Sequence, residues 1–215
     1  MKRSYTGVLL MALAGVLVVL AGVLLVIVIN SNRDPVAVLK KFGAKIKRNE
    51  QGEVVEVSLS YAKITDARLV HLKALTNLQS LSLPNKITDA GLVHLKGLTS
   101  LEFLSLRGTQ VTDAGLVHLR GLAKLQTLSL TSTKITGTGL VHLKGMTNLQ
   151  MLYLRFTKVT DAGLVHLKGL TGLQGLHLWN TKVTDAGLVH LKGLTGLQTL
   201  ELSNTKVTDA GVADL

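Results

Sequence analysis

The sequence repeats itself along most of its length. The fifteen letters TDAGLVHLKGLTGLQ occupy residues 160–174 and return unchanged at residues 184–198. Altered copies begin at Thr65, Thr88, Thr112 and Thr136. A fixed period of about 20 to 50 residues is typical of stacked arrays, in which each repeat packs only against its neighbours. The sequence therefore predicts a solenoid of the α/β class.

Each repeat contains two hydrophobic patterns. The L-x-x-L-x-L segment, as at Leu101, Leu104 and Leu106, alternates as a strand does. In the TDAGLVHLKGL segment the leucines fall three apart, which indicates a short helix with Thr112 as its N-cap and Asp113 in its first turn. One strand and one helix per repeat cannot bury both faces alone. Stacking is expected to give a parallel sheet on the concave side and short helices on the convex side.

The combined pattern, L-x-x-L-x-L followed by [IV]-T-D-A-G-L-V-H-L-K-G-L, resembles the leucine-rich repeat family. It is similar in particular to bacterial proteins built from T-D-A-G-L repeats, with strand-helix units like those of the ribonuclease inhibitor. The resemblance covers residues 54–215 and includes seven strand segments. It implies a curved scaffold used for protein recognition.

One loop position departs from the family pattern. Where the family often has asparagine, most repeats of this chain have threonine: Thr109, Thr133, Thr157, Thr181 and Thr205. A hydroxyl can donate and accept hydrogen bonds. These threonines are therefore expected to join a ladder of bonds between successive turns.

The N-terminal region predicts a membrane segment. After a short tail at residues 1–6, residues 7–29 contain no charged side chain, and a polar hinge follows at residues 30–33. A helix of this length, at about 1.5 Å per residue, crosses the roughly 30 Å hydrocarbon core of a bilayer. We expect one transmembrane helix that acts as an uncleaved signal anchor.

Two features of this segment leave alternatives open. A signal peptidase site at Ala21 is the alternative to an anchor, although the apolar run continues past it to Ile29. Lys2 and Arg3 favour a cytoplasmic N-terminus, while Arg33 and the basic residues beyond it favour the reverse. We expect a single-pass protein with the N-terminus inside and the repeats outside the cytoplasm.

Residues 34–53 are expected to cap the first repeat. Asp34 and Pro35 have the residue types of an N-cap and a first helical position. Segments 44–48 and 53–59 alternate in hydrophobicity around a polar turn, which predicts a hairpin. A helix and a hairpin here would cover the apolar end of the solenoid.

Charge and cysteine content exclude several functions. The net charge is +11, of which residues 61–215 contribute +7 and residues 1–33 contribute +3. This excess is distributed over the repeats rather than concentrated in a nucleic-acid motif, so no nucleic-acid partner is expected. The chain has no cysteine, which excludes disulfides, thiol catalysis and thiolate metal sites.

Two rows of titratable residues recur with the repeat. One histidine per repeat occupies the same helical position: His71, His94, His118, His142, His166 and His190. A metal-binding or pH-sensing stripe is one interpretation, and inheritance by duplication is the other. Inheritance by duplication is favoured, because the lysine or arginine two residues after each of these histidines would repel a metal cation. A matching row of aspartates is explained by helix starts, so no metal or cofactor is expected.

The positions at which the copies differ are more informative. Aromatic, basic and other large side chains replace small polar ones on outward strand positions of the later repeats, and Phe156 lies just past its strand. They are Phe103, Arg107, Met151, Tyr153, Arg155, Phe156, His177, Trp179 and Glu201. Phe103 and Tyr153 are expected to lie across a trough of Thr127, Ser129 and Thr131. Aromatics with arginine are typical of interaction hot spots, whereas drift on a tolerant surface is the alternative.

These features predict a membrane-anchored scaffold that binds a protein or peptide partner through its concave sheet. No catalytic set emerges, because His177 with Tyr153 and Arg155 lacks a paired carboxylate beyond an orienting role for Glu201. We therefore expect no enzyme. The alternatives are a spacer in the cell envelope that self-associates through its C-terminal end or membrane helix, and a regulatory adaptor facing the cytoplasm.

Overall fold

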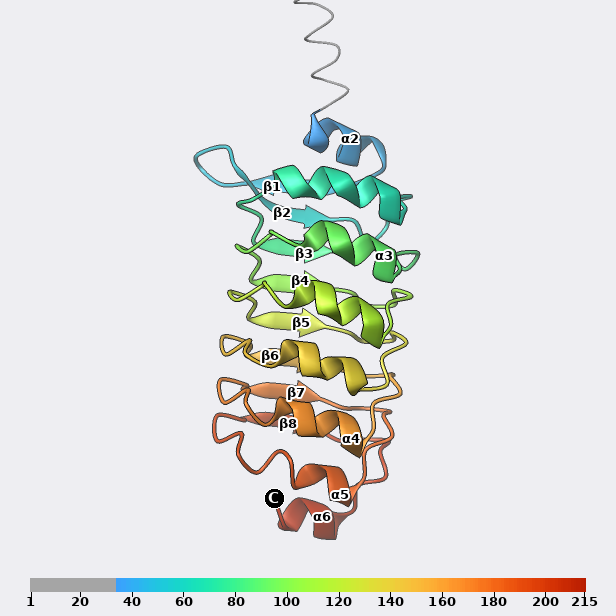
Figure 1. The fold of residues 1–215 in the computed structure, drawn as a ribbon, viewed down its shortest axis with the longest axis vertical. Helices are drawn as coiled ribbons and strands as arrows, with labels where there is room; N and C mark the ends of the chain where they lie inside the picture. The colour runs from blue at the N-terminus through green and yellow to red at the C-terminus, as the bar shows by residue number, and fades with distance from the viewer. Residues whose placement is uncertain (1–33) are drawn as a thin grey trace, which may run out of the picture.

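The computed structural model describes residues 34–215 as one continuous stack of repeats (Figure 1). A single sheet of eight strands runs along the stack in chain order. Its first two strands, β1 (Lys45–Arg48) and β2 (Val54–Ser58), are antiparallel, and all later neighbours are parallel. The later strands are β3 (Ser80–Ser82), β4 (Phe103–Ser105), β5 (Thr127–Ser129), β6 (Met151–Tyr153), β7 (Gly175–His177) and β8 (Thr199–Glu201). Seven of the eight strands, β2 to β8, lie in residues 54–215.

Short helices cover the other side of the stack (Figure 1). They are α2 (Pro35–Lys41), η1 (Asp66–Ala74), α3 (Asp89–Leu92), η2 (Val93–Leu95), η3 (Asp113–Leu119), η4 (Thr138–Leu143), α4 (Asp161–Leu164), η5 (Val165–Leu167), α5 (Asp185–Leu188) and α6 (Asp209–Ala213). The helical segment of a repeat is an α-turn that continues into a 3₁₀ turn, as in α3 and α4, or is 3₁₀ throughout, as in η1, η3 and η4, whereas α5 and α6 have no 3₁₀ continuation. This tighter winding fits a segment whose leucines recur every third residue.

The core lies between the sheet and the helices. Leu104, Leu128 and Leu152 are in register on adjacent strands and have no exposed surface. The helical leucines, such as Leu116 and Leu119, are also fully buried. Each buried leucine stabilises the fold by about 1.5–3 kcal/mol, and the core continues from one repeat to the next.

A helix and a hairpin lie at the N-terminal end of this core. The carboxylate of Asp34 accepts a hydrogen bond of 2.9 Å from the amide of Val36, and Pro35 is the first helical residue. Val36 and Leu39 are buried in the common core. The region expected to form a membrane helix, residues 7–29, lies outside the described residues. Within residues 34–215, no helix combines the length and apolar character needed to cross a membrane.

The aspartate row connects the repeats, which differs from its expected role at helix starts alone. Asp89 accepts hydrogen bonds from the amide (2.8 Å) and the hydroxyl (2.6 Å) of Thr112 in the next repeat. The same pair of bonds links Asp161 to Thr184. A carboxylate from one repeat thus fixes the start of the next helix, and the threonine then caps that helix.

The threonine row bonds within its own repeat, so the expected ladder between turns is wrong. The hydroxyl of Thr109 donates to the carbonyl of Leu106, three residues earlier, at 2.6 Å. Thr133, Thr157 and Thr181 repeat this bond. These threonines are nearly buried, and each bond satisfies a carbonyl where its strand ends.

Candidate functional site

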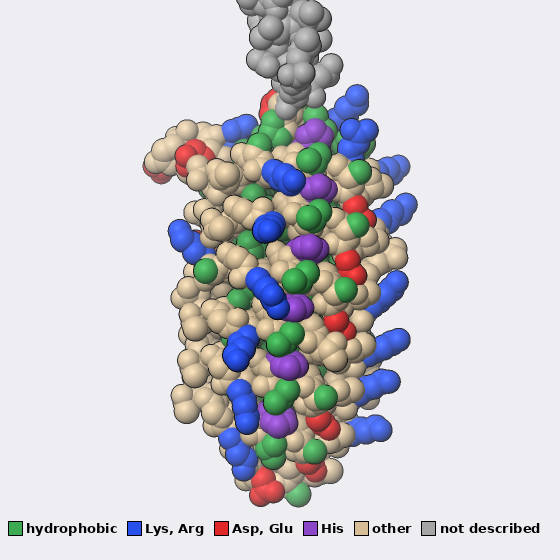
Figure 2. Space-filling view, viewed as in Figure 1, with side chains coloured by type: hydrophobic (Ala, Val, Ile, Leu, Met, Phe, Trp, Pro, Cys, Tyr) green, Lys and Arg blue, Asp and Glu red, His purple; other side chains and the backbone are tan. Residues whose placement is uncertain are grey.

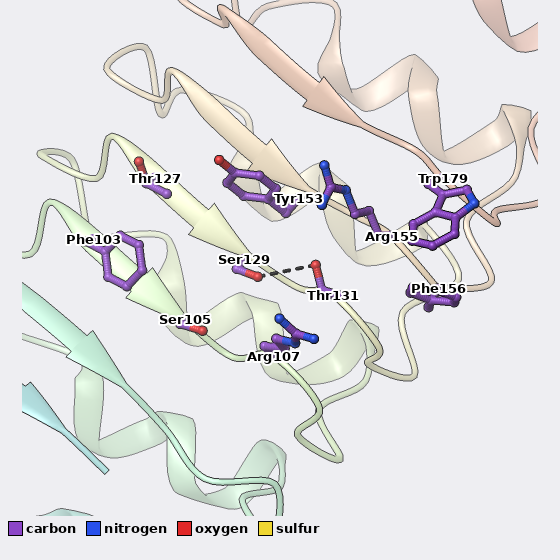
Figure 3. A pocket seen from close by; sticks show the side chains of 10 residues that line it. All are labelled: Phe103, Ser105, Arg107, Thr127, Ser129, Thr131, Tyr153, Arg155, Phe156 and Trp179. Carbon is purple, nitrogen blue, oxygen red and sulfur yellow. Dashed lines mark hydrogen bonds between the residues drawn. The ribbon is translucent and has the colours of Figure 1, made fainter. Parts of the chain in front are cut away.

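A trough crosses the sheet in the middle of the stack (Figure 3). Its floor is formed by Thr127 and Ser129 of β5 and by Thr131, two residues past the strand end. Phe103 on β4 forms one wall and Tyr153 on β6 forms the other. The trough has a volume of about 370 Å³ and is open to solvent. Its hydroxyl floor between aromatic walls offers both polar and apolar contacts.

Two arginines and two aromatics surround the trough where the strands end. Arg107, Arg155, Phe156 and Trp179 line this part of it (Figure 3). The rings of Phe156 and Trp179 lie 4.6 Å apart, centroid to centroid, at an angle of 58°. Phe156 remains 44% exposed and Trp179 remains 37% exposed, so part of each ring is available to a partner.

Arg155 is held by a polar cluster beside the trough. Its guanidinium lies 2.6 Å from a carboxylate oxygen of Glu201 and 2.9 Å from Nδ1 of His177. The same Glu201 oxygen lies 2.8 Å from Nδ1 of His177. Because a bare ring nitrogen would repel a carboxylate at this distance, we assign the proton to Nδ1, which donates it to Glu201.

Glu201 is ionised in this cluster. Burial acts to raise the pKa of Glu201, but hydrogen bonds from His177 and Arg155 outweigh it and hold the pKa below its usual value of 4.5. The negative charge of Glu201 is therefore paired with the Arg155 guanidinium inside the cluster. Its structural consequence is a fixed direction for the Arg155 side chain.

His177 supports the trough but does not line it, which corrects its expected place on the binding surface. The His177 ring stacks on Tyr153 with centroids 4.5 Å apart at 10°, and the residue is 8% exposed. Its Nε2 atom is buried without a hydrogen-bond partner. A substrate could not reach that nitrogen. The ring therefore acts as a base on which Tyr153 rests.

Met151 and Glu201 also lie outside the trough lining. Met151 extends over its neighbour in register, Gly175, where an added Cβ would lie 2.7 Å from the methionine sulfur. Phe103, Arg107, Tyr153, Arg155, Phe156 and Trp179 are the predicted site residues that the structure brings together around one cavity. Ser105, which we did not predict, joins them.

Phe156 occupies an unfavourable backbone conformation. Its φ is +56°, in the left-handed region, and the same position of other repeats holds Ser132, Asn180 and Asn204 at φ of +55° to +58°. Gly108 occupies it at +71°. Asparagine and glycine tolerate this conformation, whereas a large side chain is an outlier there. A strained residue with an exposed ring is a mark of function.

The histidine row lies on the helix side, away from the trough (Figure 2). Arg120 donates a hydrogen bond of 3.0 Å to Nδ1 of His142 in the next repeat. Burial, and then the charge of Arg120, lowers the pKa of His142 below 6.5, and burial with Lys73 lowers the pKa of His94. Among the described residues no group of three or more potential ligands could hold a metal ion.

These shifts predict an acid sensitivity. A histidine whose pKa in the folded protein lies below 6.5 binds protons more weakly than in the unfolded chain. Protonation therefore favours unfolding, and the free energy of unfolding should fall as the pH decreases from about 6.5. Urea unfolding at stepped pH values measures this. His94→Gln combined with His142→Gln should flatten the curve between about pH 7 and pH 5.

A second loss of stability is expected in stronger acid. Burial acts to raise the pKa of Asp113, but hydrogen bonds from Thr136, Gly139 and Gly137 outweigh it and hold the pKa below 3.8. A lowered carboxyl pKa stabilises the fold above the unfolded pKa, and this stabilisation is lost as the pH falls through the folded pKa. The histidine variant should retain this acid step, which serves as its internal control. An unchanged upper step in that variant would contradict the histidine assignment.

Comparisons with known proteins agree with the repeat geometry. The profile of the family described as Leucine Rich repeat matches residues 97–119, 121–143 and 194–215. An internalin (inlF) of Listeria monocytogenes str. 4b F2365 has a similar structure, with a TM-score of 0.57 and 24% identity over 85% of this chain and 58% of that one. Internalin C2 (inlC2) of the same organism also has a similar structure, with a TM-score of 0.60 and 24% identity over 85% of this chain and 88% of that one. No curated protein sequence matches the chain. At this identity the likeness shows the fold, and the chain spans little more than half the length of the first internalin.

Proposed function

We propose that this chain, which matches the Leucine Rich repeat family model at residues 97–119, 121–143 and 194–215, binds a protein or peptide partner through the trough on its sheet. The supporting observation is the distribution of aromatic side chains. Four of the seven in the chain, Phe103, Tyr153, Phe156 and Trp179, line this one cavity. Folding does not require aromatic rings on an outer sheet surface, where most of the equivalent positions in the other repeats hold serine or threonine.

The chemistry of the trough suits a polypeptide. Half-exposed aromatics and arginines are the residue types that dominate binding energy at protein interfaces. The serine and threonine hydroxyls of the floor can bond to peptide groups, and Arg155 is already oriented by Glu201. Preorganised contacts of this kind lower the entropy cost of binding.

The proposed setting is a membrane surface. The apolar residues 7–29 would anchor the chain, and the repeats would face away from the cytoplasm, where they could meet a partner in the cell envelope. Display of the same trough in the cytoplasm would need the reverse orientation of the anchor. The binding proposal itself does not depend on the orientation.

Site-specific photocrosslinking tests the proposal in the full chain. p-Benzoylphenylalanine replaces Trp179 on the trough or, as the control, Val165 on the helix side, because the two side chains are 37% and 40% exposed. In ultraviolet light, cells should yield an adduct of one defined mass from position 179 and not from position 165. Adding Tyr153→Ala to the position-179 chain should reduce the yield at least tenfold.

Two results would contradict binding at the trough. Equal adducts from both positions would indicate non-specific contact. Adducts only between copies of this chain would instead favour the spacer interpretation. Thermal unfolding of each variant must match the parent, so that a lost adduct reports the surface rather than the fold.

A further inference from the structure

The helix side presents two rows of basic residues, which the sequence alone had suggested were dispersed. One row follows the helices: Lys73, Lys96, Arg120, Lys144, Lys168 and Lys192. The other lies where each strand leads into its helix: Lys63, Lys86, Lys134, Lys158, Lys182 and Lys206. All are exposed. Figure 2 shows basic side chains on both sides of the line of histidines.

The nearby acidic residues form no ion pairs with these rows in residues 34–215. The aspartates of the helix side direct their carboxylates to the next repeat, as Asp89 does to Thr112 and Asp161 to Thr184. In residues 34–215 the ion pairs are confined to the cluster around Glu201. The lysines are therefore free to contact an external anion.

Between the two rows lie the line of histidines and half-exposed apolar side chains. One valine per repeat lies here, and their exposures range from 37% at Val117 to 53% at Val189. Because the repeats stack at the spacing of the strands, about 4.8 Å, the first row extends for roughly 24 Å over five intervals and the second for roughly 29 Å over six. The result is a broad face with basic margins and a centre of histidines and half-exposed valines. At the N-terminal end of the second row, Lys63 and Lys86 line a cavity of about 470 Å³.

We propose that this helix side lies against the anionic headgroups of a lipid bilayer. A linear polyanion would follow one row and leave the other row and the valines without contacts, whereas a planar surface meets both rows together. Each lysine or arginine close to an anionic bilayer strengthens binding about fivefold. The half-exposed valines can contact the boundary between headgroups and acyl chains.

The proposal is independent of the partner at the trough. With the helix side on the lipid, the sheet and its trough face away from the membrane, because the two surfaces lie on opposite sides of the stack (Figure 1). An anchor at residues 7–29 would keep the helix side within reach of the bilayer, although lipid contact does not require it.

Fluorescence energy transfer measures the contact in the full chain. Since the sequence has no cysteine, Val141→Cys labels the helix side and Thr199→Cys labels the sheet side with one donor each. The protein is reconstituted in phosphatidylcholine vesicles, with or without about 30% phosphatidylserine, that contain a headgroup acceptor. Phosphatidylserine should raise transfer from position 141 about twofold and leave position 199 unchanged. About 0.5 M NaCl should reverse the rise.

Charge variants with the label at position 141 separate this proposal from a general surface effect. Lys96, Lys144, Lys168 and Lys192 changed together to glutamine should abolish the increase, while the same four changed to arginine should retain it. A phosphatidylserine response that is equal at both labels, or absent, overturns the proposal. Tighter binding to polyuridylate than to the anionic vesicles also overturns it, in favour of a nucleic-acid-like polymer.

Discussion

Gly115→Ala should lower the free energy of unfolding by about 2–4 kcal/mol, because it disrupts a bridge between repeats. A Cβ at Gly115 would overlap Oδ1 of Asp89 and would lie 3.1 Å from a methyl carbon of Leu92. To relieve the overlap, Asp89 must move and weaken both of its hydrogen bonds to Thr112. Hydrogen bonds to a charged group contribute about 1.5–3 kcal/mol each.

The same repeat supplies the matched control. Gly121 has an ordinary φ and no atom within 4 Å of an added Cβ. Gly121→Ala should therefore be neutral or should stabilise the protein by up to about 1 kcal/mol. Urea unfolding of the two variants measures the difference.

A double-mutant cycle then identifies the cause. In an Asp89→Ala background the cost of Gly115→Ala should fall to about 1 kcal/mol or less, because the overlapping carboxylate is gone. Equal costs for Gly115→Ala in both backgrounds would contradict the bridge. They would assign the effect to the leucine contact instead.

The aspartate bridge explains a pattern that the sequence contains but does not interpret. In most repeats a glycine stands two residues after the aspartate. In the first repeat this position holds Arg68 instead. No aspartate precedes Arg68 by one repeat, so no carboxylate occupies the space of its side chain. Its guanidinium instead lies 5.4 Å from the ring of Phe42. The partner of each aspartate is one repeat further on, which a motif reading within one repeat cannot detect.

The bridge is interrupted once, behind the trough. Gly137 replaces the aspartate, and the side chain of Thr160 makes no cap bond. The backbones of Gly137 and Gly163 come close instead, since a Cβ at Gly137 would lie 2.8 Å from the α-carbon of Gly163. With a φ of +116°, Gly137 could not be replaced by aspartate without strain.

The strands and the core could be predicted, but the type of helix could not. Alternating leucines define each strand and its register, since a one-residue slip would expose them. The heptapeptide DAGLVHL, in contrast, is 3₁₀ throughout at residues 113–119 and combines an α-turn with a 3₁₀ turn at residues 161–167. Because the letters are identical, the difference must come from packing against neighbouring repeats.

The site was predictable where its residues depart from the repeat. Phe103, Tyr153 and Trp179 replace small residues on outward positions, and alternation alone places them on the sheet surface. The burial of His177 was not predictable in this way, because it depends on stacking with Tyr153 and on the hydrogen bond from Nδ1 to Glu201, both on neighbouring strands. The strain at Phe156 depends on a backbone angle that no residue pattern reports.

Phe156→Asn should stabilise the fold and impair binding at the same time. Asparagine occupies this left-handed position in the next two repeats, where the side chains of Asn204 and Asn180 are joined by a 2.7 Å hydrogen bond. The replacement should raise the free energy of unfolding by about 1 kcal/mol. It also removes the ring that packs on Trp179 and lines the trough. With p-benzoylphenylalanine in place of Phe103, the yield of the partner adduct should therefore fall about tenfold or more.

Ser132→Asn is the control for this prediction, because it places asparagine at the same backbone position of another repeat without altering the trough lining. It should stabilise the fold slightly and leave the crosslinking yield unchanged. If Phe156→Asn destabilised the protein, the ring would be a structural requirement. If it stabilised the protein and kept the full yield, Phe156 would be a product of drift. Only a gain in stability together with a loss of crosslinking shows that a strained residue is retained for binding.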